Sequence, residues 1–176
     1  MRGGTVIILG IDPGLADTGW GLIEVEGSRM RCRGYGCISS AATEPTPARL
    51  KRLYDELAML VALHGPAEAA IEKLFHGVNA RSAMATGQAR GVCLLATAEA
   101  GILVAEYSPA EIKQAVVGNG AADKAQVQYM VRAILALGEI PRPDHAADAL
   151  AVAICHANNR KAKLAEARAR AQEARP

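Results

Sequence analysis

The pattern of apolar and polar residues divides the chain into segments with two different periods. Five segments have the apolar or alternating character of strands: residues 5–11, 18–25, 29–38, 69–71 and 102–107. The first is a continuous apolar run, which is typical of a buried central strand, and the turn formers Asp12, Pro13 and Gly14 follow it. Gly27 and Ser28 separate the second and third segments and predict a hairpin.

Other segments place apolar residues at helical spacing. The clearest is a leucine-rich segment that Thr46 and Pro47 cap and that ends before Gly65. Four more helices are expected over about 80–100, from Pro109, over about 124–137 and over 145–158.

This order of elements mixes an antiparallel meander with βαβ crossovers. It predicts an α/β fold with a five-stranded mixed sheet and helices on both faces, forming one domain over residues 1–158. Residues 159–176 carry six basic and two acidic side chains and lack an apolar stripe. We expect them to form a basic C-terminal tail that is either an exposed helix or frayed.

Composition adds an expectation about the compartment. The four cysteines are widely spaced and form no C-x-x-C pair, so we interpret them as reduced packing residues of a cytoplasmic protein. No apolar run approaches the ~18 residues that cross a bilayer, and we expect no membrane association. Outside the tail the chain is nearly neutral, so charge alone does not indicate a polyanion partner.

Acidic and imidazole side chains at three places predict a cation site. Asp144, His145 and Asp148 start the last predicted helix, where residues three or four apart share a face. Asp12 and Glu72 end two apolar strands, and they would emerge side by side if those strands are adjacent and parallel. Such ligands suit Mg²⁺ or Mn²⁺, and a pair of ions can cleave a phosphoester.

Each of these residues taken alone has a simpler explanation. Asp12 fits a turn, Glu72 a solvated strand end, and Asp144 an N-cap. Asp148 is harder to explain in this way, because it is surrounded by alanine, leucine and valine, where a buried carboxylate without a partner is costly.

Several ordered motifs resemble one known family. They are residues 8–14, 18–21, 71–75, 79–83, 87–91, 113–118, 124–128 and 146–151. Together they make the chain similar to the RuvC family of bacterial Holliday-junction resolvases from Ile8 to about His156. The resemblance implies a ribonuclease H-like fold and metal-dependent, paired symmetric nicking of four-way DNA junctions by a homodimer, in recombination and repair.

The resemblance also implies roles for single residues. Asp12, Glu72 and Asp148 correspond to catalytic carboxylates that hold metal, with two Mg²⁺ ions per subunit expected and Mn²⁺ as an alternative. The fourth acidic ligand of the commonest family pattern falls on His145. We expect His145 to bind metal and to favour Mn²⁺, with Asp144 as the alternative ligand.

Further implied contacts are to DNA and to proteins. Lys124 and Lys113 correspond to phosphate-contacting lysines, and Phe75 to an aromatic residue that stacks on a base. Gly87 and Gly91 lie one turn apart in a predicted helix and indicate close packing against the sheet or a second subunit. RuvA and RuvB are the partner proteins expected by family analogy.

Two other functions stay open at this point. One is a non-catalytic DNA-binding relative of the same fold. The other is a nucleotide phosphotransferase of the actin-like superfamily, whose first phosphate loop resembles the segment from Asp12 to Gly19, although such proteins need two related domains.

Overall fold

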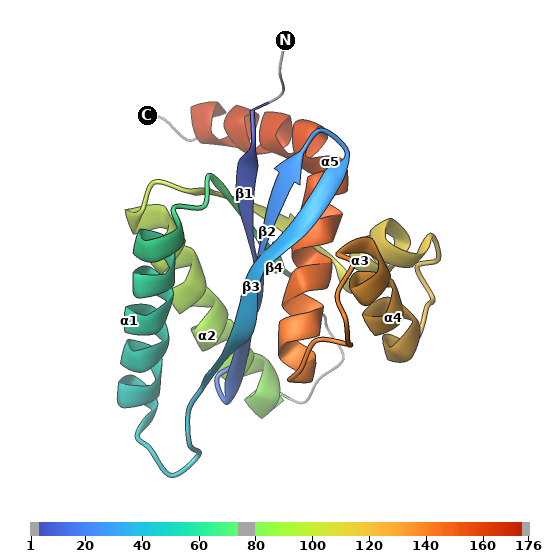
Figure 1. Cartoon of the computed structure of the whole chain (residues 1–176). Helices are drawn as coiled ribbons and strands as arrows, with labels where there is room; N and C mark the ends of the chain where they lie inside the picture. The colour runs from blue at the N-terminus through green and yellow to red at the C-terminus, as the bar shows by residue number, and fades with distance from the viewer. Residues whose placement is uncertain (1–3, 74–79, 174–176) are drawn as a thin grey trace.

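A five-stranded mixed sheet forms the centre of the computed structural model, which describes residues 4–73 and 80–173 (Figure 1). The strands are β1 (Val6–Asp12), β2 (Asp17–Glu26), β3 (Arg29–Ser39), β4 (Glu68–Glu72) and β5 (Leu103–Tyr107), in the order β3-β2-β1-β4-β5. β1 pairs antiparallel with β2 and parallel with β4, and β4 pairs parallel with β5. The predicted five-stranded mixed sheet is therefore confirmed, and the condition under which Asp12 and Glu72 emerge side by side is met, because β1 and β4 are adjacent and parallel.

Helices cover both faces of the sheet, as the sequence predicts. α1 (Thr46–His64) and α2 (Ala80–Glu99) lie on one face, and α5 (Asp144–Glu173) crosses the other with α3 (Pro109–Val117) and α4 (Lys124–Ile134) beside it (Figure 1). Among the described residues, no helix combines the length and apolar character needed to cross a membrane.

Two apolar clusters hold these layers together. Successive residues of β1 point to opposite faces, so Ile8 packs under α5 while Leu9 packs under α1 and α2. Each cluster consists mainly of alanine, valine, leucine and isoleucine, since aromatic residues are only 3% of the chain. Small side chains let α5 lie close to the sheet, and this closeness positions the residues discussed below.

Two predicted helix ends are wrong. Thr46 does not cap α1, because Pro45 is the N-cap residue and its carbonyl accepts the first amide hydrogen bonds. α4 ends at Ile134 and not near Leu137, because Ala136 adopts a left-handed conformation (φ 52°) and reverses the chain.

The last helix is longer than predicted. α5 begins at Asp144 and continues to Glu173, so the basic segment after Asn158 extends the same helix. Its first part is held to the body of the protein, since Arg160 binds Glu68 on β4 and Lys163 lies 3.6 Å from a carboxylate oxygen of Glu111 on α3.

Candidate metal centre

The turn after β1 fixes the position of Asp12. The buried hydroxyl of Thr18 donates to the carbonyl of Gly14 at 2.6 Å, and the amide of Gly14 donates back to that hydroxyl at 3.3 Å. Pro13, between Asp12 and Gly14, restricts the backbone further. Asp12 therefore leaves the sheet in one defined direction, with its side chain 15% exposed.

Glycines on β1 and β2 allow the start of α5 to reach Asp12. A Cβ atom on Gly19 would collide with the carbonyl oxygen of His145, and one on Gly10 would collide with that of Ala149. The helix backbone thus lies directly on the strand backbones at these two points. Any larger residue would push the first turns of α5 away from the sheet.

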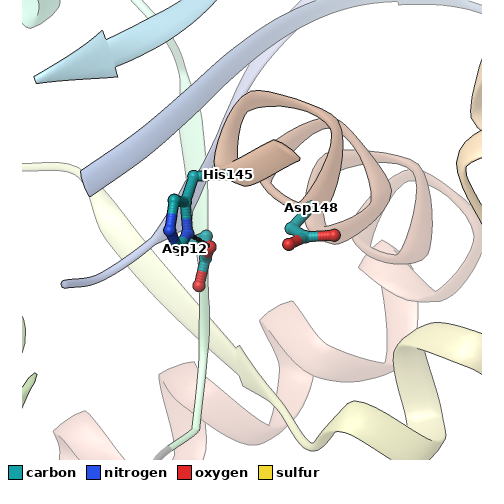
Figure 2. A group of neighbouring side chains, drawn as sticks. All are labelled: Asp12, His145 and Asp148. Atoms are coloured by element: carbon teal, nitrogen blue, oxygen red, sulfur yellow. Dashed lines mark hydrogen bonds and ion pairs between the residues drawn. The ribbon is translucent and has the colours of Figure 1, made fainter. Parts of the chain in front are cut away.

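Asp12, His145 and Asp148 converge at this end of the sheet (Figure 2). His145 Nδ1 lies 2.7 Å from Asp12 Oδ2, and one ligand atom from each of the three residues lies within 4.8 Å of the other two. One carboxylate comes from a strand, and the other two groups come from the first turns of α5. This spacing could hold a metal ion.

Glu72 faces the same group from the end of β4. Burial, followed by the negative charges of Asp12 and Asp148, raises the pKa of Glu72 to about 8. Glu72 is not among the three residues whose ligand atoms lie within 4.8 Å of one another, yet it shares a cavity of about 190 Å³ with Asp148. All four predicted ligands therefore occupy one region of the protein.

The electrostatics of the region fit a divalent cation. Burial is the main cause that raises the pKa of Asp148, and the nearby Asp12 charge adds to it. The hydrogen bond to Asp12 raises the pKa of His145, so this imidazole takes a proton readily and partly neutralises the carboxylates. A divalent cation would provide the same neutralisation more completely, and carboxylate and imidazole donors suit such ions.

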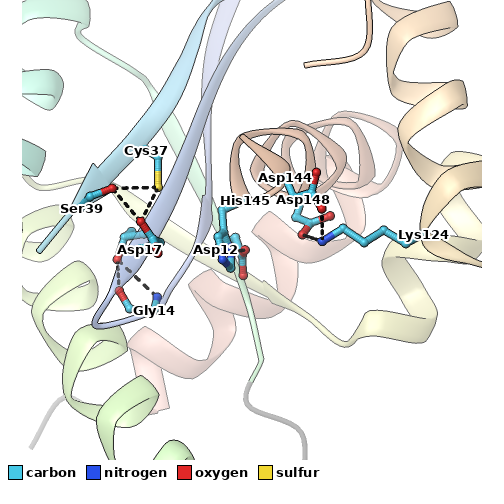
Figure 3. Close-up of polar contacts among 10 residues, drawn as sticks. Asp12, Gly14, Asp17, Cys37, Ser39, Lys124, Asp144, His145 and Asp148 are labelled. Atoms are coloured by element: carbon cyan, nitrogen blue, oxygen red, sulfur yellow. Dashed lines mark hydrogen bonds and ion pairs between the residues drawn. The ribbon is translucent and has the colours of Figure 1, made fainter. Parts of the chain in front are cut away.

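Asp144 is paired with cations and shares Lys124 with Asp148 (Figure 3). Its carboxylate pairs with Arg142 and lies 3.4 Å from Lys124 Nζ. Lys124 also binds Asp148 at 3.0 Å. Of the two alternatives for the fourth ligand, the structure thus places His145, and not Asp144, beside Asp12.

Two of the three predicted DNA contacts can be located. Lys124 is the first residue of α4 after the N-cap Asp123, and Lys113 on α3 lines the cavity that contains Glu72 and Asp148. Both ammonium groups therefore border the acidic groups. Phe75 lies outside the described residues.

The sequence reasoning missed a polar cluster next to His145. Asp17 accepts a hydrogen bond from Ser39 Oγ at 2.6 Å, and Cys37 Sγ lies 3.7 Å from the same carboxylate oxygen (Figure 3). The charge of Asp17 contributes to the raised pKa of His145. Only strand pairing reveals this cluster, because Asp17 and Ser39 are partners in β2 and β3.

Comparisons with known proteins find a matching family and matching structures. A family model described as "Crossover junction endodeoxyribonuclease RuvC" matches residues 8–156. Proteins of that name from Heliobacterium modesticaldum and Chloroflexus aggregans are 51% and 53% identical, over 88% and 85% of this chain and 95% and 91% of their own length. The structure "T. thermophilus RuvC in complex with Holliday junction substrate" matches with a TM-score of 0.84 and 35% identity, over 91% of this chain and 96% of that one. The expected ribonuclease H-like fold is thereby confirmed.

Proposed function

Because this chain belongs to the RuvC family of crossover junction endodeoxyribonucleases, we propose that it resolves four-way DNA junctions in recombination and repair by paired symmetric nicks. The observation that carries this proposal is the convergence of Asp12, His145 and Asp148, with Glu72 facing them, at one end of the sheet. These residues come from β1, β4 and α5, so the fold itself assembles the site.

The four side chains would hold two divalent cations, Mg²⁺ or Mn²⁺. Ions of this kind activate a water and stabilise the leaving oxygen of a phosphodiester, which leaves 5′-phosphate and 3′-hydroxyl ends. The raised pKa values of Glu72 and Asp148 support this assignment, because the buried carboxylates are only partly neutralised by Lys124 and His145, and a cation would relieve the remaining repulsion.

The lysines bordering the carboxylates would orient DNA. Lys124 pairs with Asp148 and Asp144 in the free protein, and its side chain is 52% exposed, so it is accessible to an incoming phosphate. Lys113 lines the cavity on the α3 side and would contact a neighbouring phosphate. Phe75 would stack on a base, which is worth ~1–3 kcal/mol.

The imidazole of His145 should shift the metal preference toward Mn²⁺, because nitrogen ligands suit transition metals better than Mg²⁺. Nicking rates of the wild type and His145→Asp in Mg²⁺ and in Mn²⁺ test this. The expected result is a lower ratio of Mn²⁺ to Mg²⁺ rates for His145→Asp. An unchanged ratio would reject the assignment.

A homodimer would present two such sites to a junction with two-fold symmetry. The exposed face of α2 supports this assembly. Met84 is 68% and Leu95 53% exposed, and a Cβ on the exposed Gly91 would meet no atom of the described residues within 4 Å. Leu95→Glu should then yield a monomer in analytical ultracentrifugation. Assembly with RuvA and RuvB stays a prediction from the family.

The function is tested with a synthetic four-way junction that can branch-migrate, incubated with protein and Mg²⁺. We expect symmetric nicks in two opposite strands and products that ligase rejoins, with no cutting of a linear duplex of the same sequence. Binding of the junction without nicking would support the non-catalytic relative instead. Nucleotide hydrolysis without nicking would support the phosphotransferase.

A further inference from the structure

A buried chain of polar side chains joins the middle of α5 to β4 and β5. His156 is 0% exposed, and its Nδ1 lies 2.9 Å from the hydroxyl oxygen of Tyr107 at the end of β5. Its Nε2 lies 3.0 Å from Oε2 of Glu68, the first residue of β4. Arg160 Nε donates to the same oxygen at 3.0 Å, and the Arg160 guanidinium also binds the other oxygen.

Each hydrogen bond in this polar network has a defined donor and acceptor. Although burial acts to raise it, the pKa of Glu68 is held below its usual value by Arg160 and His156, so the carboxylate is ionised and only accepts. Burial lowers the pKa of His156, which keeps the ring neutral. Its Nε2–H therefore donates to Glu68, and its Nδ1 accepts the hydroxyl proton of Tyr107.

Apart from the hydrogen bond between His145 Nδ1 and Asp12 Oδ2, which joins two of the expected metal ligands themselves, the contacts between α5 and the sheet near the metal centre are mostly packing contacts. Gly10 and Gly21 face Ala149, Leu150 and Ala153, so much of this contact is between small groups and backbone. Such apolar contact is not directional. Hydrogen bonds between buried groups are directional, and leaving one unmade is costly.

The polar network and the metal centre are separated by similar distances along β4 and along α5. Glu68 and Glu72 begin and end β4, which separates them by about 13 Å at ~3.3 Å per residue. His156 and Asp148 lie about two turns apart on α5, which separates them by about 12 Å at ~1.5 Å per residue. Tyr107 also pairs with Glu72 in the β4–β5 register. The bonds of His156 to Glu68 and Tyr107 therefore influence how far Asp148 on α5 lies from Glu72 on β4.

We propose that the network formed by Tyr107, His156, Glu68 and Arg160 fixes the register of α5 against β4, so that His145 and Asp148 face Asp12 and Glu72. The inference rests on the proposed nuclease function and makes these four side chains positioning residues for it. A slip of α5 by one residue moves Asp148 by about 1.5 Å along the helix axis and turns it by about 100°. Misplacement of about 1 Å in an active site can reduce a rate by about 100-fold.

The test uses His156→Leu, Tyr107→Phe and His156→Gln, whose amide can still donate to Glu68. Ile154→Ala is the matched control, because Ile154 is also fully buried on α5 but its apolar side chain makes none of the hydrogen bonds of the network. Binding of Mn²⁺ to the DNA-free protein is measured by calorimetry below the unfolding temperature of each variant. Junction affinity and single-turnover nicking are measured on the same samples.

We expect Mn²⁺ affinity to fall by about 10–100-fold in His156→Leu, by less in Tyr107→Phe, and to recover partly in His156→Gln, with unchanged junction affinity. Ile154→Ala should lose stability but keep wild-type Mn²⁺ affinity. Wild-type Mn²⁺ affinity in both His156→Leu and Tyr107→Phe would overturn the inference, as would an equal loss in Ile154→Ala. Failure of the wild type to nick, with the expected Mn²⁺ results, would refute the nuclease function and leave the register assignment standing.

Discussion

The start of α5 and the region about three turns further along it use similar residue types in opposite ways. At the start, Asp148 lies with Asp12 and Glu72, and burial and mutual repulsion raise the pKa values of Glu72 and Asp148. Further along, Glu68 is also buried, but the pKa of its carboxyl is lowered because the Arg160 guanidinium neutralises it and both Arg160 and His156 donate hydrogen bonds to it.

This difference separates a binding site from a structural contact. A buried carboxylate with cationic partners contributes to stability, whereas carboxylates gathered without enough cations destabilise the fold until a ligand arrives. The metal centre is thus expected to cost stability, and the distal network is expected to supply it. Substitutions at the two ends should change stability and activity in different directions.

The largest contrast is expected between Glu72→Gln and Glu68→Gln. Glu72→Gln should reduce nicking by about 1,000-fold, since metal contributions of several kcal/mol are lost, yet raise the melting temperature in EDTA because the fold disfavours ionisation of this buried carboxyl and the amide does not ionise. Glu68→Gln should lower the free energy of unfolding by on the order of 3 kcal/mol by leaving Arg160 and His156 without their anion. Differential scanning calorimetry beside a nicking assay measures both. A lower melting temperature for Glu72→Gln would contradict the contrast.

A smaller effect on rate is expected from Gly19→Ala. The added Cβ meets the carbonyl oxygen of His145 and should displace the first turn of α5, reducing nicking by about 100-fold. Gly138→Ala is the control, because no described atom lies within 4 Å of its added Cβ. Equal nicking rates for Gly19→Ala and Gly138→Ala would show that close approach of α5 is not needed.

The two ends should also differ in the sign of their pH dependence. The pKa of Glu72 is raised from 4.5 to about 8, so the unfolded chain releases this proton first and stability falls as pH rises between those values. The pKa values of His156 and Glu68 are lowered from 6.5 and 4.5, so the unfolded chain binds these protons first and stability falls as pH drops below each value.

Urea unfolding in EDTA across this pH range measures both contributions. Glu72→Gln should remove the decline in the free energy of unfolding as pH rises toward 8. His156→Gln should reduce the decline in the free energy of unfolding that begins as pH falls below about 6.5. The predicted pH dependence would be wrong if Glu72→Gln steepened the fall in stability toward pH 8, or if His156→Gln steepened the fall in stability toward acid pH.

The smallest stability effect is expected from Lys124→Gln. This lysine is 52% exposed, so its ion pairs with Asp148 and Asp144 should contribute less than about 1 kcal/mol. Its contact with DNA should appear instead as a decrease of about 1 in the slope of junction affinity against salt. Lys51→Gln, which removes a more exposed ion pair with Asp55 on α1, should leave that slope unchanged. Equal slopes for both variants would remove Lys124 from the DNA contact.

Much of the fold could be predicted because periodicity in the sequence determines it. The continuous apolar run before Asp12 predicted a central strand, and the order of elements predicted a mixed sheet, whereas the parallel pairing of β1 with β4 was only a condition for Asp12 and Glu72 to meet. The end of α4 could not be found in this way, because the left-handed residue there is Ala136, where glycine is usual. Likewise, the sequence did not indicate that Pro45 is the N-cap of α1, because this residue makes no side-chain capping hydrogen bond.

The candidate site was predicted residue by residue, but its supports were not. Asp12, Glu72, His145 and Asp148 come from motifs, whereas the fit of Gly19 against His145 and the bond between Glu68 and His156 join positions far apart in the chain. Such pairs can be recognised only once the packing of α5 on the sheet is known. One feature of the sequence could have pointed to the buried network. His145 and His156 are spaced so that they lie about three turns apart on one face of the predicted helix.

The most direct test of the central claim is nicking of a mobile four-way junction by Asp148→Asn beside the wild type, with junction binding measured in the same reactions. Asp148→Asn retains the size of the side chain and removes one of the charges that face Asp12 and Glu72. We predict wild-type junction affinity with nicking reduced by about 1,000-fold. Nicking at the wild-type rate by Asp148→Asn would contradict the account.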